Sequence, residues 1–322
     1  MTPTVAVVIV NWNSWALLAR CLQALAAQTF QGFSVTIIDN ASQSEPPADL
    51  LAAYPTARLV RHPSNIGFAA ANNLAVNQYT GHSPWVALLN PDAFAQPDWL
   101  AQLMQAAQTH PYGAVFASRQ LNATDPTLID GDGDCYHVSG RAWRSGYGQP
   151  VTSHRPAGLP VRPVFSPCGA AALYRRSAYV EAGGLDEDFF CYFEDVDLGF
   201  RLQLAGYPCL LVPTAVVHHV GSASTGGQHG DFAVYHGHRN LVWTYFKNMP
   251  SLLFWLFLPL HLALNVWTLL HYRQRLAVVW RAKKDALLGL PAMLAKRQHI
   301  QAQRRASVGS VWRALSLRWP KQ

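Results

Sequence analysis

The sequence predicts an α/β protein built around an open, largely parallel sheet. Short apolar runs rich in β-branched residues alternate with stretches of helical periodicity in the first third of the chain, which is the pattern of strands joined by crossover helices. Polar residues follow these runs directly, and ligands of such sheets bind beyond the carboxyl ends of the strands. With 322 residues and a hydrophobic share of 50%, the chain is too apolar to be disordered and long enough for an α/β domain with an appendage.

The first elements are expected in the order strand, helix, strand. Each strand is a short apolar run such as VAVVIV, and each helix repeats its apolar side chains every three or four positions. Ser14 stands as a helix cap ahead of the first helix. We therefore expect strands over residues 5–10, 35–38, 57–60 and 85–89 and helices over residues 17–28, 48–54, 67–78 and 98–107.

The polar residues at the strand ends are the first candidates for a site. Residues 11–13, Asp39 with Asn40, and residues 90–92 each come directly after an expected strand. Because parallel strands end at the same edge of a sheet, these three groups should converge.

The second half of the chain is less regular. Residues 131–167 are rich in Gly, Pro, Ser and Arg and are expected to form loops with a hairpin that reaches over the sheet and touches the substrate. Further elements are a helix that closes over residues 178–183, a helix over residues 194–205 with Gly206 as its stop, and a strand over residues 209–212 before Pro213.

The cysteines and the N-terminal residues exclude two classes. Five scattered cysteines without a C-x-x-C pair indicate neither a disulfide scaffold nor a structural zinc site, and they favour a reducing compartment. The first apolar run is short and lacks a basic leader, so it is interpreted as a strand and not as a signal peptide.

The net charge of +7 conceals a division of the chain. Residues 239–322 hold 14 Lys and Arg and one acid, which gives 14 − 1 = +13, and the rest holds 11 Lys and Arg and 17 acids, which gives 11 − 17 = −6. A basic tail suits nucleic acid or an anionic membrane surface. Residues 249–272 (MPSLLFWLFLPLHLALNVWTLLHY) carry no Lys, Arg, Asp or Glu. An arm that binds nucleic acid does not need such an apolar segment, so we expect the partner of the tail to be a membrane and not a nucleic acid.

An acidic cluster interleaved with aromatics is the strongest chemical signal. Residues 186–197 hold six acids, with Phe189, Phe190, Tyr192 and Phe193 between them, which a solvated acidic surface would not carry. Aromatic side chains restrict water around the carboxylates, and a desolvated carboxylate can act as a general base near neutral pH.

Seven segments in order carry a family resemblance. They are VVIVNWN (7–13), IDNAS (38–42), NIGFAAANN (65–73), LLNPD (88–92), GGLDEDFFCYFEDVDLGFRL (183–202), HHVGSAS (218–224) and HRNLVW (238–243). Together they resemble the inverting family-two glycosyltransferases with the GT-A fold, most closely the rhamnosyltransferase-like members. The resemblance implies transfer of a sugar from a nucleotide-diphosphate donor to a hydroxyl of a membrane or lipid-linked glycan in cell-envelope polysaccharide biosynthesis. Rhamnose from a deoxythymidine or uridine diphosphate donor is the leading expectation.

The resemblance also implies the donor site. Asp39 is expected to read the N3–H of a pyrimidine base, and Arg239 either to contact the diphosphate or to cap a helix. The implied nucleotide-sugar residues are Asn11, Asn13, Asp39, Asn65, Gly67, Asn73, Asn90, Asp92 and Arg239.

A divalent cation, Mg²⁺ or Mn²⁺, is expected with the donor diphosphate. Asp92 resembles the acid of a D-x-D-type metal motif whose first position here is Asn90, and by itself Asp92 would also suit a turn or helix cap. His219 resembles the family's late metal ligand, with His218 as the alternative. A second acidic run, Asp130, Asp132 and Asp134, lies in a turn-rich segment and is not expected to bind the metal.

For catalysis, the resemblance implies that Asp195 is the base and that Glu194 orients it or the acceptor. Gly169 and Tyr192 are expected with Glu194 at the acceptor. Asp197 and Arg201 suit an i, i+4 ion pair as well as a site role. Residues 222–230 are expected to form a mobile lid.

Two other classes compete with this interpretation. A non-catalytic protein that binds nucleotide sugars or lipid-linked glycans could use the same sheet, but binding alone needs no base among aromatics. A Rossmann oxidoreductase is disfavoured because no G-x-G-x-x-G follows the first strand.

We expect a GT-A domain over residues 1–248 and membrane-associating helices over residues 249–322. Twenty-four uncharged residues could span a bilayer, but Pro259, His261 and Asn265 would lie near its centre. A single span would also export residues 273–322, which carry a charge of 12 − 1 = +11, against the positive-inside tendency. A peripheral or re-entrant helical hairpin on the cytoplasmic face is therefore preferred over a span and over helices that only pack on the enzyme. Its expected headgroup-level residues are Trp255, Trp267, Trp280 and Trp312.

Overall fold

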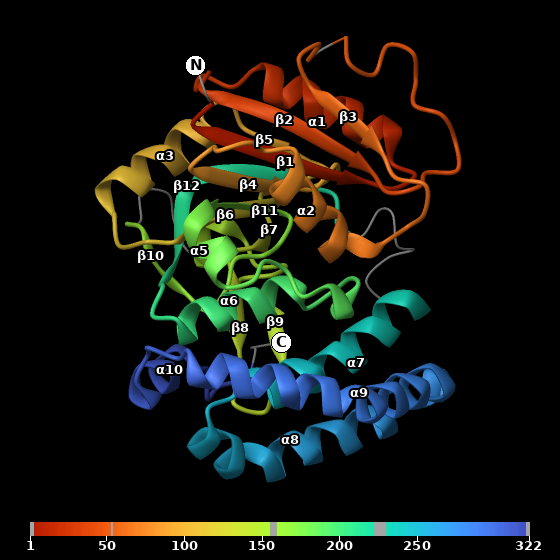
Figure 1. Ribbon diagram of the computed structural model, residues 1–322, viewed down its shortest axis with the longest axis vertical. Helices are drawn as coiled ribbons and strands as arrows, with labels where there is room; N and C mark the ends of the chain where they lie inside the picture. Colours follow the sequence, from red (N-terminus) through yellow and green to blue (C-terminus); the bar gives the residue numbers. More distant parts are fainter. Residues whose placement is uncertain (1–2, 53, 155–159, 222–229, 320–322) are drawn as a thin grey trace.

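A ten-stranded sheet forms one end of the molecule, and a group of helices forms the other (Figure 1). The computed structural model describes residues 3–52, 54–154, 160–221 and 230–319. The sheet comprises β1 (Val5–Asn11), β2 (Phe33–Asp39), β3 (Arg58–Arg61), β4 (Trp85–Leu89), β5 (Ala93–Ala95), β6 (Val115–Asn122), β7 (Ile129–Gly131), β10 (Arg162–Val164), β11 (Ala171–Arg175) and β12 (Cys209–His219). Its order is β10-β12-β6-β11-β4-β1-β2-β3, with β5 on β12 and β7 on β6.

The N-terminal half of the sheet is parallel, as the sequence predicts. Strands β3, β2, β1 and β4 run in one direction. Strand β11 is inserted antiparallel between β4 and β6, and β12 runs parallel to β6. The expected α/β class with a mostly parallel sheet is therefore confirmed.

Two helical layers cover the sheet because its central strands are apolar on both faces. Along β1, Val5, Val7 and Ile9 face the layer of α1 (Trp15–Ala26) and α3 (Trp99–Thr109). Val8 and Val10 face the opposite layer, with α2 (Gly67–Gln78), α5 (Arg176–Glu181) and α6 (Glu194–Leu204). Each face thus receives alternate side chains of the same strand.

The C-terminal helices lie beyond α6, on the side away from the sheet (Figure 1). They are α7 (Asp231–Asn248), α8 (Ser251–His271), α9 (Leu276–Ala302) and α10 (Val308–Ala314). Strands β8 (Asp134–Tyr136) and β9 (Ala142–Arg144) form the expected hairpin and reach toward these helices. Tyr136 of this hairpin packs with residues of α6, α7 and α8 in one apolar cluster.

Two expected elements were wrong. The described part of residues 48–54 forms turns instead of a helix, although Leu50 is buried and Leu51 and Tyr54 pack against the core. Its amides bond to carbonyls three residues earlier, and Pro55 disfavours a helical conformation of the residue before it. The strand after Gly206 does not end at Pro213 but continues to His219. Its register shifts between Val212 and Val216, and proline is tolerated at such irregular positions because it has no N–H to donate.

Candidate functional site

A cavity of about 1370 Å³ lies at the carboxyl ends of β1 and β4 and continues toward the C-terminal helices. Its sheet side includes Trp12, Asn40, Asn90 and Asp92. Asn11 donates from Nδ2 to Oδ1 of Asp39 over 3.3 Å. The structure therefore brings together the three polar strand ends that the sequence singles out.

Part of the predicted donor site lines this cavity. Asn65, Gly67, Asn90 and Asp92 are on its wall. Gly67 requires glycine because its φ is +85° and because a Cβ atom there would lie 2.6 Å from the ring of Phe190. Asn65 Oδ1 accepts from the amides of Gly67 and Asn40, at 2.9 and 3.0 Å, and fixes the turn into α2.

Other predicted donor residues lie behind the wall. The Asp39 carboxylate is fully buried and accepts from Asn11, Ser42 and Arg61. Asn13 is on the same strand end, where Oδ1 accepts from the amide of Gln43. Recognition of a base by Asp39 stays a prediction.

Asn73 and Arg239 are not among the described residues that line the cavity. Asn73 donates to the carbonyl of Leu185 over 2.7 Å. Arg239 donates to the carbonyls of Asp188 and Phe189 and stacks over Trp243. Both residues brace the segment that precedes α6, and any contact of theirs with the donor stays a prediction.

The aromatic segment before α6 has an unusual backbone. Phe190, Tyr192 and Phe193 have φ values of 64°, 66° and 69°, in the left-handed region that costs an L-residue about 1–2 kcal/mol. Asn240 of α7 holds this segment by donating from Nδ2 to the carbonyls of Phe189, Cys191 and Tyr192. The three left-handed aromatics line the cavity, as expected for side chains that exclude water from the acids beside them.

The two predicted catalytic acids occupy the first turn of α6 and line the cavity. Asp195 accepts from the amide of Gly169 at 2.7 Å and from its neighbour Val196 at 2.8 Å. Gly169 is tightly fitted, since a Cβ atom there would lie 3.0 Å from Asp195 Oδ2. Within the described residues, Oε2 of buried Glu194 has no hydrogen-bond partner. Tyr192 and Gly169, predicted at the acceptor, are on the same wall.

The two acids differ in their electrostatic environment. Burial and then the charge of Asp195 raise the pKa of Glu194 well above its ordinary value. Burial also raises the pKa of Asp195, but the amides of Gly169 and Val196 oppose that rise by stabilising the charged form. Of the pair, Asp195 is the carboxyl that ionises more readily, which suits it to accept a proton.

His219 stands at the end of β12 beside Asp92. Its Nε2 lies 3.3 Å from Asp92 Oδ1, and its Nδ1 lies 2.8 Å from Asp130 Oδ2. Burial lowers the pKa of His219, but these two carboxylates outweigh burial and raise the pKa to about 9. His218 instead contacts Gln96, at 3.4 Å, so of the two alternative histidines only His219 joins Asp92 on the cavity wall.

The second acidic run proves to be part of this neighbourhood. Asp130 contacts His219 and pairs with Arg144, Asp132 pairs with Arg119, and Asp134 lines the cavity. These acids were not expected at the site because they lie in a turn-rich segment, although three acids in five residues were a visible signal. Among the described residues, no group of three or more His, Cys, Asp and Glu is arranged to hold a metal ion. The predicted lid lies outside the described residues except for Gly230.

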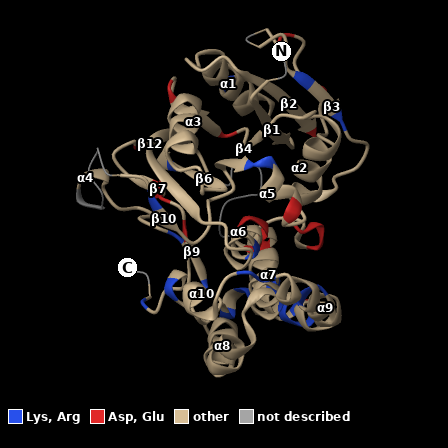
Figure 2. Ribbon diagram, turned by 60° about the vertical axis from the view of Figure 1, so that its left-hand side comes forward, with Lys and Arg blue, Asp and Glu red and all other residues tan. Residues whose placement is uncertain are grey.

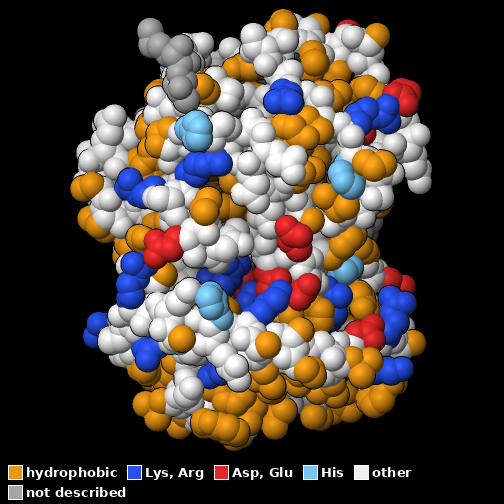
Figure 3. Space-filling model, in the orientation of Figure 1, with side chains coloured by type: hydrophobic (Ala, Val, Ile, Leu, Met, Phe, Trp, Pro, Cys, Tyr) orange, Lys and Arg blue, Asp and Glu red, His pale blue; other side chains and the backbone are white. Residues whose placement is uncertain are grey.

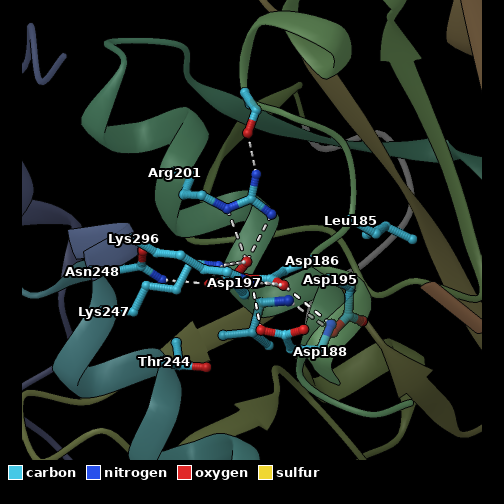
Figure 4. A network of polar contacts seen from close by, with 12 residues as sticks. Leu185, Asp186, Asp188, Asp195, Asp197, Arg201, Thr244, Lys247, Asn248 and Lys296 are labelled. Carbon is cyan, nitrogen blue, oxygen red and sulfur yellow. Dashed lines mark hydrogen bonds and ion pairs between the residues drawn. The ribbon is translucent and has the colours of Figure 1, made fainter. Parts of the chain in front are cut away.

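A buried ionic network supports α6 from behind (Figure 4). Asp197 receives two hydrogen bonds from Arg201 and others from Lys247 and Asn248 of α7. Lys247 also pairs with Asp186, which Lys296 of α9 contacts as well. Neither Asp197 nor Arg201 is among the described residues that line the cavity, so the in-helix ion pair is the observed role.

Comparisons with known proteins agree on one family. The model of Glycosyl transferase family 2 matches residues 6–182, and that of Glycosyl transferase family group 2 matches residues 147–296. The chain is 34% identical over 251 residues to an N-acetylglucosaminyl-diphospho-decaprenol L-rhamnosyltransferase of Mycobacterium tuberculosis, which covers 70% of this chain and 79% of that protein. It is 28% identical to the O-antigen biosynthesis protein RfbC of Myxococcus xanthus, over 68% of this chain and 17% of that protein.

A solved structure shows the same fold. The crystal structure of GalNAc-T7 with UDP, GalNAc and Mn²⁺ superposes with a TM-score of 0.62 at 16% identity, over 77% of this chain and 48% of that chain. At this identity the likeness concerns the fold alone.

Proposed function

Because the chain belongs to glycosyltransferase family 2, in its rhamnosyltransferase-like branch, we propose that it transfers rhamnose to a lipid-linked glycan with inversion at the anomeric carbon. The observation that carries the proposal is the Asp195 carboxylate, held on the cavity wall by the amide of Gly169. The similar mycobacterial protein, whose name states a rhamnosyl transfer and a diphospho-decaprenol acceptor, supports both the sugar and the acceptor class.

The proposed reaction is a single displacement. An acceptor hydroxyl gives its proton to Asp195 as its oxygen forms a bond to the anomeric carbon. The bond from that carbon to the donor diphosphate breaks, and the nucleoside diphosphate leaves with the electron pair. Glu194, whose pKa is raised by burial and by Asp195, is protonated in this scheme and donates a hydrogen bond to the acceptor.

Asp92 and His219 would hold the proposed divalent cation. They lie next to each other on the cavity wall. Asp130 contacts Nδ1 of His219, and this contact orients the ring so that its other nitrogen, Nε2, faces Asp92. A carboxylate and an imidazole suit Mn²⁺, while Mg²⁺ would retain more water ligands. The bound cation would neutralise charge on the departing diphosphate.

The proposed location is the cytoplasmic face of the membrane, and the two faces of α8 support it. Its polar side chains His261 and Thr268 are buried against the protein, and His261 donates from Nδ1 to the carbonyl of Ser139 over 2.8 Å. Its outer face is apolar, and hydrophobic side chains cover this end of the molecule (Figure 3). The exposed large side chains of α8 are Leu252, Trp255, Leu256, Leu260, Leu262, Val266, Trp267 and Leu270.

This distribution favours a helix that lies in the interface. Among the described residues, α8 is the one helix long and apolar enough to span a bilayer, and 28% of its apolar window is buried in the protein. A spanning helix would expose its buried polar face to lipid or detach from α7 and α9. Lys and Arg on α9 and α10 (Figure 2) lie beside this end of the molecule, where anionic lipid would attract them. Trp255, Trp267 and Trp280 are exposed, whereas Trp312 stacks on Phe257.

Substitution of Asp195 by Asn tests the proposed reaction. The variant should bind the donor normally but turn over about a hundred to ten thousand times more slowly, because it lacks a positioned base. Asp49→Asn, on the exposed surface, is the matched control. Donors are chosen by screening a panel of nucleotide sugars for hydrolysis, and the anomeric configuration of the product is read by NMR. Near-normal turnover of Asp195→Asn would remove Asp195 as the base, and a product of retained configuration would exclude the single displacement.

A further inference from the structure

The cavity is larger than a nucleotide-sugar site alone requires. Its volume of about 1370 Å³ exceeds the roughly 300–1,000 Å³ usual for a small-molecule site. Besides Asp195, its wall includes side chains from the last two turns of α8. We call this part the α8 arm, and its walls on the helical side are Leu264, Trp267, Thr268, His271 and Tyr272.

Another part of the cavity wall is aromatic and cationic. It comes from the β8–β9 hairpin and the turn after it, with Arg141, Trp143, Arg144 and Tyr147. Arg144 is paired with Asp130. Arg141 stacks over Trp319 at 5.3 Å and forms no ion pair with any described residue, so its charge is available to an anionic ligand.

A buried lysine lies behind His238 of α7, next to the cavity. Lys283 of α9 is 8% exposed, and its Nζ donates to the carbonyl of His238 at 3.1 Å. His238 itself lines the cavity. Within the described chain no carboxylate pairs with Lys283, and burial lowers its pKa to about 7. A ligand anion near His238 would supply the missing counter-charge.

Trp267 connects the α8 arm to the outside of the molecule. Trp267 lines the cavity, is 46% exposed, and belongs to the exposed apolar side chains of α8. Val266 and Leu270 flank it and are exposed as well. A ligand that leaves the arm past Trp267 therefore meets an apolar surface and not a charged one.

We propose that the α8 arm binds a polyprenyl diphosphate, the lipid carrier of the acceptor sugar. The diphosphate lies between Arg141 and the wall backed by Lys283, the first isoprene units pass Trp267, and the attached sugar reaches Asp195. The cavity wall offers a base, a cation and an exposed aromatic side chain, and these suit the sugar, the diphosphate and the isoprene units of such a lipid. This inference rests on the proposed function, because it assigns the acceptor of the same site.

The test is binding of geranylgeranyl diphosphate to the full-length protein in detergent, measured by calorimetry. Trp267→Ala should weaken binding about tenfold, the effect of losing one aromatic contact of about 1.4 kcal/mol. Trp255→Ala is the matched control, since Trp255 is exposed on the same helix but does not line the cavity. Arg141→Gln should also weaken the binding of geranylgeranyl diphosphate. It should not change the binding of geranylgeraniol, which lacks the diphosphate. Arg313→Gln, on the exposed surface of α10, controls for loss of charge.

Equal weakening by Trp267→Ala and Trp255→Ala would overturn the proposal, because it would indicate contact with micelles only. Binding of inorganic diphosphate as tightly as of the lipid would also overturn it. These outcomes are separate from failure of the proposed function. If the protein binds the lipid diphosphate through Trp267 but transfers no rhamnose, the proposal for the α8 arm stands and the proposed reaction is wrong. If the protein glycosylates lipid-linked acceptors and the Michaelis constants of Trp267→Ala and Arg141→Gln are unchanged, the proposed function stands and the α8 arm is not the lipid site.

Discussion

Replacement of Lys247 by Met should destabilise the enzyme strongly although Lys247 does not line the main cavity. The ammonium is 2% exposed and lies 2.5 Å from Asp186 and 2.9 Å from Asp197, whose carboxylate is fully buried. Asp197 keeps Arg201 and Asn248 in the variant, and Asp186 keeps Lys296. The network now has three cations and three carboxylates and would keep only two cations in the variant. Its members are Lys247, Arg201 and Lys296 with Asp186, Asp188 and Asp197.

Removal of one partner from a buried ion pair costs about 3–5 kcal/mol, because the other charge stays desolvated. The retained partners of both carboxylates place Lys247→Met toward the lower end of that range. Lys296→Met is the matched control: it removes the same charge from Asp186, but its side chain is 36% exposed, and exposed pairs contribute about 0–1 kcal/mol.

Urea unfolding followed by circular dichroism measures both variants. Lys247→Met should lower the free energy of unfolding by about 3 kcal/mol with an unchanged dependence on urea, and Lys296→Met by less than about 1 kcal/mol. If the two variants lose the same amount, burial does not determine the strength of the network and the reasoning fails. Asp197 lies two residues after Asp195 on α6, so a loosened network should also lower turnover more than donor affinity.

Three further outcomes are expected. Excess EDTA should abolish transfer, and added Mn²⁺ should restore the activity of the wild-type enzyme but not that of Asp92→Ala. Full activity in EDTA would remove the cation from the mechanism. Leu256→Glu with Val266→Glu should move the enzyme from the membrane pellet to the soluble fraction at low salt, whereas Val180→Glu, exposed on α5, should not; wild-type protein that is already soluble would refute the interfacial location. The turnover rate should rise with pH through a pKa above the ordinary aspartate value of about 3.9, because burial raises the pKa of Asp195 and the base acts ionised; a rate that is flat down to that value would contradict the assignment.

The fold was predictable where hydrophobic periodicity is uninterrupted. Strand β1 is buried at every position, and an apolar run reports such a strand directly. Strand β6 gave no such signal because Ser118, Arg119 and Gln120 stand in its middle. Ser118 accepts from Trp99 and Arg119 pairs with Asp132, and partners this distant in the sequence cannot be recognised from periodicity.

The candidate site was predictable from motifs that follow strands, and less so elsewhere. Asn90 and Asp92 come directly after β4 and line the cavity. Asp130 reaches His219 through the pairing of β6 with β12 and β7, which joins segments about ninety residues apart. The ionic network likewise unites α6, α7 and α9. For this reason truncation after Lys247, which the predicted boundary suggests, would remove Lys296 and expose the network, and surface substitutions on α8 test membrane binding more cleanly.

The left-handed aromatic segment before α6 and the core of the sheet should lose their structure at different temperatures. Its three strained residues together cost about 3–6 kcal/mol, comparable with the roughly 5–15 kcal/mol that usually separates a folded domain from the unfolded chain. Asn240 and the amides at the start of α2 hold the segment in place through its carbonyls. On warming, we expect these few hydrogen bonds to break before the sheet unfolds, so that the wall beside Asp195 relaxes while the core is still intact. Catalytic inactivation should therefore precede melting, and glycine in place of Tyr192 or Phe193 should raise the inactivation temperature while removing part of the aromatic wall.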